Sequence, residues 1–459
     1  MSTLAAPRPT PPRADFTEGS VVRAVVRMGL PSMIGFGVSS IYDIVDMLWV
    51  SRLEGAPVAA LTFFFPFLWV ITSVNQIAGA GSVAVISRRY GERDIAGTEA
   101  AIKDAILLKL ALAFVVGGIG YAMLTRGLRL VGTTPEAFDQ AVAYGRVYLI
   151  GLGAGFSSWT IFTALRGVAD PVKAMLLMIA GNVLNLLLDP LFIFGVGPFP
   201  EMGIAGAALA SVIAYGSTFA AGLWIFFAGR SNVRLHLHGE LPISAARMGR
   251  MLKIGAPAGV GSLSFALGRT VVLPWIAAFG TQVVAAFGMA QRVMGFGIML
   301  IVGMGLGLSA LIGQTLGAGK LQRTWETAVR SVQFSGGAMA VYGALLMLGA
   351  PAIAAAFFGG GPEASIAVTT LRIIAVALPF QGVGIMFEMT CSGAGETRVP
   401  LAFNLFYTWI LQVPAVYLAT RVWGWPYPLV WWTFVVSASL PPFLFAVYFR
   451  TRRWMGRTV

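Results

Sequence analysis

Charged residues are scarce in this chain of 459 residues. Asp, Glu, Lys and Arg make up 11% of it, whereas hydrophobic residues make up 57%. A soluble globular protein carries about 25% charged residues, so this chain lacks the polar groups that would cover a soluble surface. Lipid is the apolar solvent that fits such a composition. The 56 glycines and 24 prolines agree, because membrane helices tolerate both residues.

Cysteine and histidine are almost absent as well. The single Cys391 excludes an intramolecular disulfide, and with only 2 histidines the chain has no Cys/His cluster. We therefore expect no cofactor and no structural metal site. The segment from Met1 to Phe16 is polar and proline-rich and lacks the apolar core of a signal peptide. We expect residues 1–20 to form a disordered tail.

Long apolar runs fill the rest of the chain. A helix needs about 20 mostly apolar residues to cross a bilayer, and twelve runs reach that length. The sequence thus predicts an all-α membrane protein with twelve transmembrane helices. The runs lie at residues 24–50, 58–87, 104–125, 141–164, 173–196, 204–228, 251–279, 284–311, 331–358, 367–391, 400–421 and 428–449.

The basic residues are unevenly divided among the loops between these runs. One alternating set of loops, with both termini, holds 23 Lys and Arg residues, and the other set holds 4. Lys and Arg favour the cytoplasmic side, so we expect a multi-pass protein of a bacterial inner membrane with both termini in the cytoplasm. In a soluble protein the net charge of +13 would suggest nucleic acid, but basic loops explain the charge here and we expect no such partner.

The two halves of the chain repeat at one fixed offset in residue number, the separation between Gly29 and Gly255. Six spans per repeat insert both halves in the same orientation, and parallel repeats of this kind typify transporters with a substrate site between the halves. We expect two pseudo-symmetric six-helix bundles, an N-lobe (1–228) and a C-lobe (251–459), joined by a cytoplasmic linker (229–250). The matches are Gly29, Pro31 and Gly35 with Gly255, Pro257 and Gly261, Gly91 with Gly317, Arg146 with Arg372, and Gly167 with Gly393.

Acidic residues occur inside the predicted spans of the N-lobe. A charged group at mid-bilayer costs about 2.5–3.5 kcal/mol on insertion scales and usually marks function. Asn182, Asn185 and Asp189 form one stripe on a helix. Polar residues also serve simply to hold helices together, which remains the alternative for each of them. The topology places further oxygen-bearing side chains at a comparable depth, which predicts a pocket for a proton or a small cation such as Na⁺ made by Asp43, Asp46, Tyr144, Asn185, Asp189 and Ser211.

The C-lobe lacks this acid pair, since Asp46 and Asp189 correspond to Val272 and Ala415 at the same offset. Glu388 is its only acid within a predicted span. Arg269 is a candidate counter-ion for Glu388, and together they are a second possible site for substrate or charge.

Several motifs resemble the MATE family of multidrug and toxic compound extrusion transporters. They are GLPSMIGFGVSSIYDIVDMLWVSRL, SRRYGERD, LRGVADP and GNVLNLLLDPLFIFG in the first half, with IGAPAGVGSLS and LIGQTLGAGK in the second. The resemblance implies two six-helix bundles around a central cleft, no enzymatic activity, and export of small amphipathic, mostly cationic compounds in exchange for H⁺ or Na⁺. We expect a monomer in contact with membrane lipid.

The DinF-like branch of the family is the most similar, because its coupling site lies in the first lobe. The resemblance implies coupling roles for Asp46, Asn185 and Asp189, and for Ser211 and Tyr144. Asp43 and Glu388 depart from the branch pattern.

Two other functions stay open. A lipid or lipid-linked oligosaccharide flippase of the same superfamily would favour a cationic cleft, whereas few basic residues appear within the spans. A membrane-embedded prenyl-diphosphate enzyme could use the DxxD formed by Asp43 and Asp46 to hold Mg²⁺. Such an enzyme needs a second acidic cluster, which the sequence does not offer.

Overall fold

The structure is a computed structural model that describes residues 15–237 and 240–457. Within these ranges all regular secondary structure is helical, which confirms the predicted all-α class. Prolines begin several helices, including Pro57 and Pro171, where the missing N–H is no loss. Asp94 caps another helix by accepting a hydrogen bond from the Gly97 amide at 2.8 Å.

The first half of the chain forms one bundle, the N-lobe. Its helices are α1 (Val21–Val50), α2 (Pro57–Gly91), α3 (Ile95–Leu130), α4 (Pro135–Ile150), α5 (Leu152–Gly167), α6 (Pro171–Phe194) and α7 (Ile204–Phe227). The second half forms the C-lobe. Its helices are α8 (Ala245–Ala277), α9 (Thr281–Gly317), α10 (Leu321–Phe358), α11 (Pro362–Ala375), α12 (Leu378–Gly393), α13 (Arg398–Leu405), α14 (Val413–Tyr417) and α15 (Tyr427–Arg450).

The described helices account for twelve spans. Ten stretches are long and apolar enough to cross a membrane, and two bent pairs supply the others. The pair α4 and α5 is bent by 52°, and the pair α11 and α12 by 45°. The bends fall at Gly151 and at Ala377, two positions that correspond at the offset of the repeat. The repeat therefore extends to the position of the bends, and the predicted architecture of two six-span bundles is confirmed.

One span differs between the lobes. In the N-lobe, α6 is a continuous α-helix, whereas its counterpart in the C-lobe contains two π-helical stretches, Phe406–Gln412 and Leu418–Val422, on either side of α14. Such π-helical turns are rare and often lie at functional sites.

Two predicted boundaries need correction. Residues 1–14 of the expected tail lie outside the described residues, but residues 15–20 are not a free tail. The Arg323 guanidinium donates hydrogen bonds to the backbone carbonyls of Phe16 at 2.8 Å and Gly19 at 2.7 Å. In the linker, α8 begins at Ala245, so the predicted linker residues 245–250 are its first turns.

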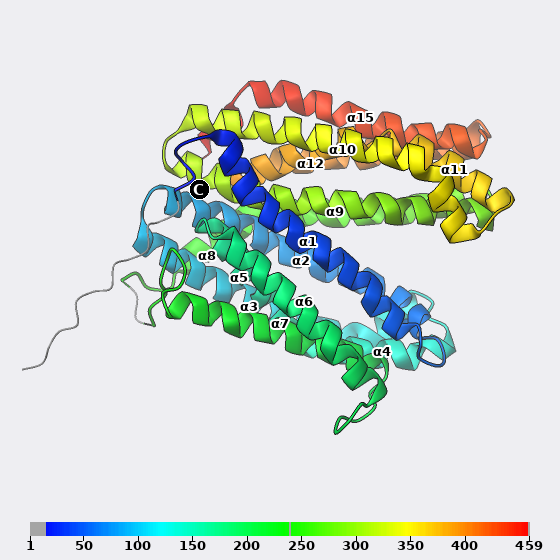
Figure 1. The fold of residues 1–459 in the computed structure, drawn as a ribbon, viewed down its shortest axis with the longest axis horizontal. Coiled ribbons are helices and arrows are strands. Elements are labelled where there is room, and N and C mark those ends of the chain that lie inside the picture. The colour runs from blue at the N-terminus through cyan, green and yellow to red at the C-terminus, as the bar shows by residue number, and fades with distance from the viewer. Residues whose placement is uncertain (1–14, 238–239, 458–459) are drawn as a thin grey trace, which may run out of the picture.

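The two lobes lie closest together on the side where α1 begins and the chain ends, here called the terminal side. Figure 1 shows the helices diverging from there toward α4 and α11. At the contact, helix backbones pack directly through glycines: Gly255 of α8 lies against the Ile77 carbonyl of α2, and Gly307 of α9 against the Met28 carbonyl of α1. Gln314 adds a hydrogen bond across the lobes to the Gly167 carbonyl at 2.9 Å.

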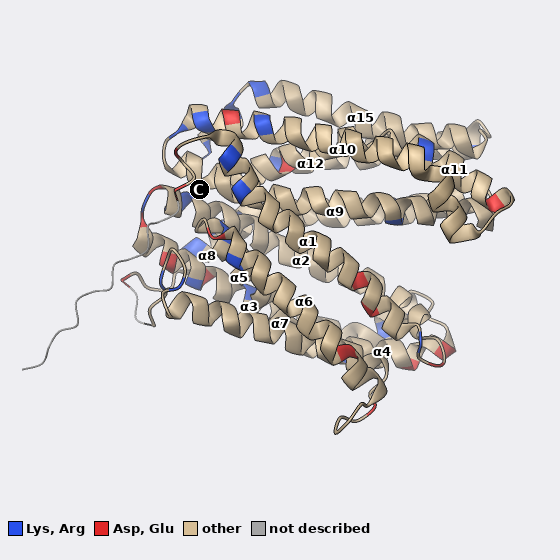
Figure 2. Ribbon diagram, in the orientation of Figure 1, with Lys and Arg blue, Asp and Glu red and all other residues tan. Residues whose placement is uncertain are grey.

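Charged side chains gather on the same side. In Figure 2 most Lys and Arg residues lie at the terminal ends of the helices, while the middle of the bundle is nearly free of charge. The Lys/Arg bias found in the loop sequence is therefore a real asymmetry of the molecule.

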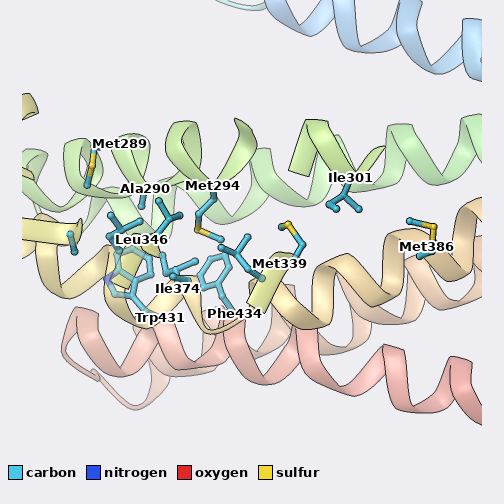
Figure 3. Packing of buried hydrophobic residues seen from close by; sticks show 14 of the residues in the cluster. Met289, Ala290, Met294, Ile301, Met339, Leu346, Ile374, Met386, Trp431 and Phe434 are labelled. Carbon is cyan, nitrogen blue, oxygen red and sulfur yellow. The ribbon is translucent and has the colours of Figure 1, made fainter. Parts of the chain in front are cut away.

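Each lobe has an apolar core of its own. In the C-lobe, Phe287 stacks on the fully buried Trp431 with ring centroids 5.1 Å apart, and Figure 3 shows Ile374 and Phe434 beside the same indole. The Trp431 indole N–H donates to the Thr370 hydroxyl at 3.1 Å, which satisfies its polar atom. The same apolar cluster also includes Met28 of α1 and Val83 of α2, so apolar packing continues across the contact between the lobes.

Candidate functional site

Two aspartates meet inside the N-lobe. Asp46 lies four residues before the end of α1, and Asp189 lies five residues before the end of α6. Asp189 is fully buried, and its carboxyl group lies within hydrogen-bonding reach of the Asp46 carboxyl group. We call these two residues the acid pair. The sequence predicted that both would contribute to one pocket, and the structure brings them into contact.

Asn185 connects the acid pair to α7. It sits one turn before Asp189 and is 3% exposed. With its amide nitrogen facing Asp189, it donates to Asp189 Oδ1 at 2.9 Å and accepts from the Ser211 hydroxyl at 2.9 Å. This orientation satisfies both ends of the amide.

Tyr42 was missed by the sequence analysis. Its hydroxyl lies 2.9 Å from the amide nitrogen of Asn185 in the same arrangement. The signal was present, because Tyr42 is four residues before Asp46 and therefore lies on the same face of α1. Tyr215 was missed in the same way: it lies four residues after Ser211, and its hydroxyl lies close to Asp43 and Asp46.

Tyr144 lies close to both acids and belongs to an aromatic cluster. Its ring stacks on Tyr148 at 5.9 Å and meets Phe64 edge-on at 5.3 Å. Asp43 lies beside Asp46 but has an exposed side chain. The structure therefore brings Asp46, Tyr144, Asn185, Asp189 and Ser211 close together, with Asp43 beside them.

The acid pair also ties α1 to α6. Near it, the Asn182 amide donates to the Ser39 hydroxyl at 2.8 Å. One oxygen of Asp46 is buried and makes no hydrogen bond within the protein. Two carboxylates so close cannot both carry a free negative charge, whereas one proton held between them relieves the repulsion. The arrangement is thus chemically suited to taking up and releasing a proton.

A second feature is a cavity between the lobes. It has a volume of about 60 Å³ and is bounded by α2, α3 and α5 on one side and by α8, α9, α12 and α13 on the other. Ligand pockets usually measure about 300–1,000 Å³, so the cavity as it stands holds a few water molecules, and an organic compound enters it only when the lobes separate further. Trp159 lines the cavity and packs edge-on against Phe36 at 5.8 Å. Phe36 precedes Asp46 by ten residues on α1, or about 15 Å along the helix.

Two basic residues of this cavity were missed or misplaced by the sequence analysis. Lys109 lies within a predicted span, interrupting the apolar run ILLKLAL, and should have been counted among the intramembrane ionisable groups. Arg166 lies two residues beyond the predicted span 141–164 and was therefore counted with the basic residues of a loop, but it is the penultimate residue of α5 and is 2% exposed. Both line the cavity.

Glu388 and Arg269 do not form the expected pair. Glu388 lies on α12 and opens into the cavity. Arg269 lies on α8 beside Tyr407, and no ion pair joins the two residues. The counter-ion hypothesis is therefore wrong, because the two side chains face different neighbours.

A family model described as MatE matches the chain twice, over residues 31–191 and 257–418. The two matches cover more than two-thirds of the chain, and their first residues correspond at the offset of the internal repeat. The chain belongs to the MATE family. Membership makes it a transporter and excludes the prenyl-diphosphate enzyme considered above.

Curated relatives and solved structures match the chain over most of its length. A probable multidrug resistance protein, YpnP of Bacillus subtilis, is 26% identical over 408 residues, covering 87% of this chain and 88% of that protein. A FAD transporter of Shewanella oneidensis is 26% identical over 420 residues, covering 88% and 89%. The structure superposes on an outward-facing conformation of a multidrug resistance MATE family transporter with a TM-score of 0.89 and 26% identity, covering 96% of this chain and 98% of that one.

Proposed function

We propose that this MATE transporter exports small organic compounds across the inner membrane of a bacterium in exchange for protons. The observation that carries the proposal is the acid pair, which lies where α1 and α6 meet and can hold one proton between two carboxyl groups. Relatives named as multidrug resistance proteins support a broad range of organic substrates. The position of the acids in the N-lobe favours the DinF-like branch.

The geometry suggests how a proton could drive movement. A proton between Asp46 and Asp189 draws α1 toward α6, and its loss leaves two like charges that repel each other. The equilibrium between two packings of α1 then depends on protonation. Because α1 also carries Phe36, which packs on the cavity residue Trp159, a shift of α1 changes the wall of the cavity. Substrate release then follows from proton binding.

The sidedness follows from the basic residues. The terminal side holds most of the Lys and Arg side chains, which favours the cytoplasm for both termini and for the linker. The lobes are packed together on that side and diverge on the other. With the terminal side in the cytoplasm, the lobes would be open toward the outside, and the similarity to an outward-facing MATE family structure supports this orientation.

Transport by the purified full chain in proteoliposomes tests the proposal. Vesicles with an acidic interior should accumulate a cationic dye such as ethidium, and an imposed Na⁺ gradient of equal size should have no effect. Uptake driven by Na⁺ alone would overturn the assignment of the proton as coupling ion. Absence of uptake under either gradient would overturn ion-driven export itself.

A further inference from the structure

Lys109 and Arg166 differ from the other buried charges of the protein. Elsewhere in the described chain, outside the acid pair, each buried charged side chain has a partner of opposite sign. Asp104 pairs with Arg247 at 2.5 Å and Glu99 with Lys103 at 2.7 Å. Asp170 and Glu396 pair with Lys173 and Arg457. Lys109, at 1% exposure, and Arg166, at 2%, have no such partner among the described residues.

The two basic groups lie together and face the cavity. Lys109 and Arg166 are close enough for their charges to repel each other. Arg166 Nη1 is buried and makes no hydrogen bond within the protein, and the Lys109 ammonium donates none to any described residue. Burying an unpaired charge is strongly unfavourable, and burying two that repel each other is more so. A negative group bound beside the pair would offset this cost.

The remaining wall of the cavity does not supply that charge. Its only acid among the described lining residues is Glu388, on the opposite lobe, where it forms no ion pair. Other lining groups are neutral and also lack partners within the protein, namely Asn75 Oδ1, Asn404 Oδ1 and Ser309 Oγ. A negative group that enters the cavity therefore meets two cations on the N-lobe side, with neutral polar groups around it and Glu388 on the C-lobe side.

The cations belong to the N-lobe alone. At the offset of the repeat, Lys109 corresponds to Ser335 and Arg166 to Ser392. Symmetry of the fold therefore does not require basic residues at these positions. The aromatic ring of Trp159, one turn before Thr163 and two turns before Arg166 on α5, adds an apolar surface beside them.

We propose that Lys109 and Arg166 form an anion subsite in the central cavity, and that this transporter carries amphipathic compounds that bear both a phosphate group and an aromatic ring. A phosphate oxygen accepts hydrogen bonds from both the guanidinium and the ammonium, and charge-assisted bonds of this kind are strong. The ring packs against Trp159. The subsite deepens the proposed transport function and rests on it. The sequence analysis counted the few basic residues within the spans against a cationic cleft. Lys109 and Arg166 make this cavity more basic than that count indicated, so phosphorylated substrates are compatible with it.

Binding of flavin mononucleotide and riboflavin to the purified full chain tests the subsite. The two molecules differ by one phosphate, and both report binding through flavin fluorescence. The wild-type chain should bind flavin mononucleotide at least roughly tenfold more tightly than riboflavin, and Lys109→Met should abolish the difference. Arg166→Gln should do the same. Lys103→Met, on the same helix but paired with Glu99 outside the cavity, is the matched control and should keep the preference. Equal affinity of the wild type for both flavins, or a preference that survives Lys109→Met, would overturn the proposal.

Two further measurements test for a structural role of Lys109 and for a lipid phosphate in the subsite. Without ligand, Lys109→Met should melt no lower than the wild type, since it removes an uncompensated charge, and a lower Tm would reveal a structural partner and overturn the subsite.

In nanodiscs, flavin mononucleotide affinity that is equal with and without phosphatidylglycerol supports a soluble phosphate compound. If phosphatidylglycerol lowers the affinity of the wild type for flavin mononucleotide but does not lower that of Lys109→Met, a lipid headgroup occupies the subsite. That result would overturn the proposal of a soluble substrate. Ethidium uptake by the wild type reports the proposed export separately, so the two proposals fail independently.

Discussion

At the scale of single residues, the chemistry of this transporter is concentrated in one of two similar lobes. The repeat preserves glycines and prolines, which set backbone geometry, but it does not preserve the charged groups of the acid pair and the cavity. Four such positions are neutral in the C-lobe, namely Asp46 and Val272, Asp189 and Ala415, Lys109 and Ser335, and Arg166 and Ser392. The C-lobe then provides the surface against which the N-lobe moves when its charged groups change their state.

Removing either member of the acid pair should abolish proton-driven export. Asp46→Asn and Asp189→Asn both keep the shape and can still form hydrogen bonds, but neither variant retains two carboxyl groups that can share one proton. We expect dye efflux in everted vesicles to fall to the level of vesicles without the protein, at matched expression. The exposed Asp43 provides the comparison, and Asp43→Asn should retain most of the activity. Wild-type efflux by both Asp46→Asn and Asp189→Asn would make the coupling site wrong.

The charge of Glu388 should set the preference between cationic and anionic compounds. Glu388→Gln removes the acid that faces the cavity while keeping its size. A unit charge at about 4 Å in water contributes roughly 1 kcal/mol, or about fivefold in affinity. We expect ethidium to bind about fivefold more weakly and flavin mononucleotide more tightly, as measured by fluorescence titration. Parallel changes for both ligands would instead indicate a loss of structure.

The sequence allowed part of this site to be predicted. Acids inside apolar runs are costly, so Asp46, Asp189 and Glu388 stood out, and helical spacing placed Asn185 with Asp189. Tyr42 and Tyr215 did not stand out, because an aromatic residue in a membrane helix has many structural uses. Contacts between side chains on different helices could not be predicted from the sequence either. The expected contact between Arg269 and Glu388 was wrong because it was based on opposite charge alone, and the sequence does not show how α8 and α12 are aligned.

At the scale of helices, the lobes meet through glycines whose hydrogen atoms face a neighbouring backbone. Gly255 of α8 shows this most clearly, since a Cβ there would collide with the Ile77 carbonyl of α2. Its counterpart Gly29 faces the flexible side chain of Met304 instead. Glycines at matched positions of the repeat therefore face different neighbours in the two halves, and the sequence repeat alone did not reveal this difference.

Substituting these glycines should distinguish the two contacts. Gly255→Ala must separate α2 from α8 and should cost about 1–3 kcal/mol, as overpacking generally does. Gly29→Ala should cost less, because Met304 can rotate away. Thermal unfolding in detergent measures both, and transport should fall with Gly255→Ala. Gly249→Ala, on the open part of α8 with no atom within 4 Å, is the control and should not lower the Tm. A Gly255→Ala protein as stable as this control would contradict the packing.

The bends and π-helical stretches were not predicted. Hydropathy finds the two interrupted spans but does not show that they break at Gly151 and Ala377, since neither position is a proline. Likewise, nothing in the apolar run 400–421 predicts π-helical turns, because their hydrogen-bond pattern depends on the neighbouring helices. Local sequence determines where a span is, and packing determines its shape.

At the scale of the whole molecule, the repeat and the basic loops were enough to predict two parallel bundles of six spans. Both signals come from physical constraints that act along the entire chain, namely the thickness of the bilayer and the preference of Lys and Arg for one side. How the lobes meet depends on side chains far apart in sequence, such as Gln314 and Gly167. The terminal-side contact was therefore accessible only from the structure.

Labelling with a membrane-impermeant maleimide checks the proposed orientation. The only native cysteine, Cys391, is buried, and Cys391→Ala gives a background without thiols. Two exposed acids then serve as reporters: Glu240 in the linker, on the terminal side, and Glu201 in the loop between α6 and α7 at the opposite end of the bundle. In intact cells Glu201→Cys should react and Glu240→Cys should not, because the basic residues keep the linker in the cytoplasm. After the cells are opened, both should react, which shows that each thiol is accessible. The reverse pattern in intact cells would place both termini outside and would make the packed side of the lobes the outer one.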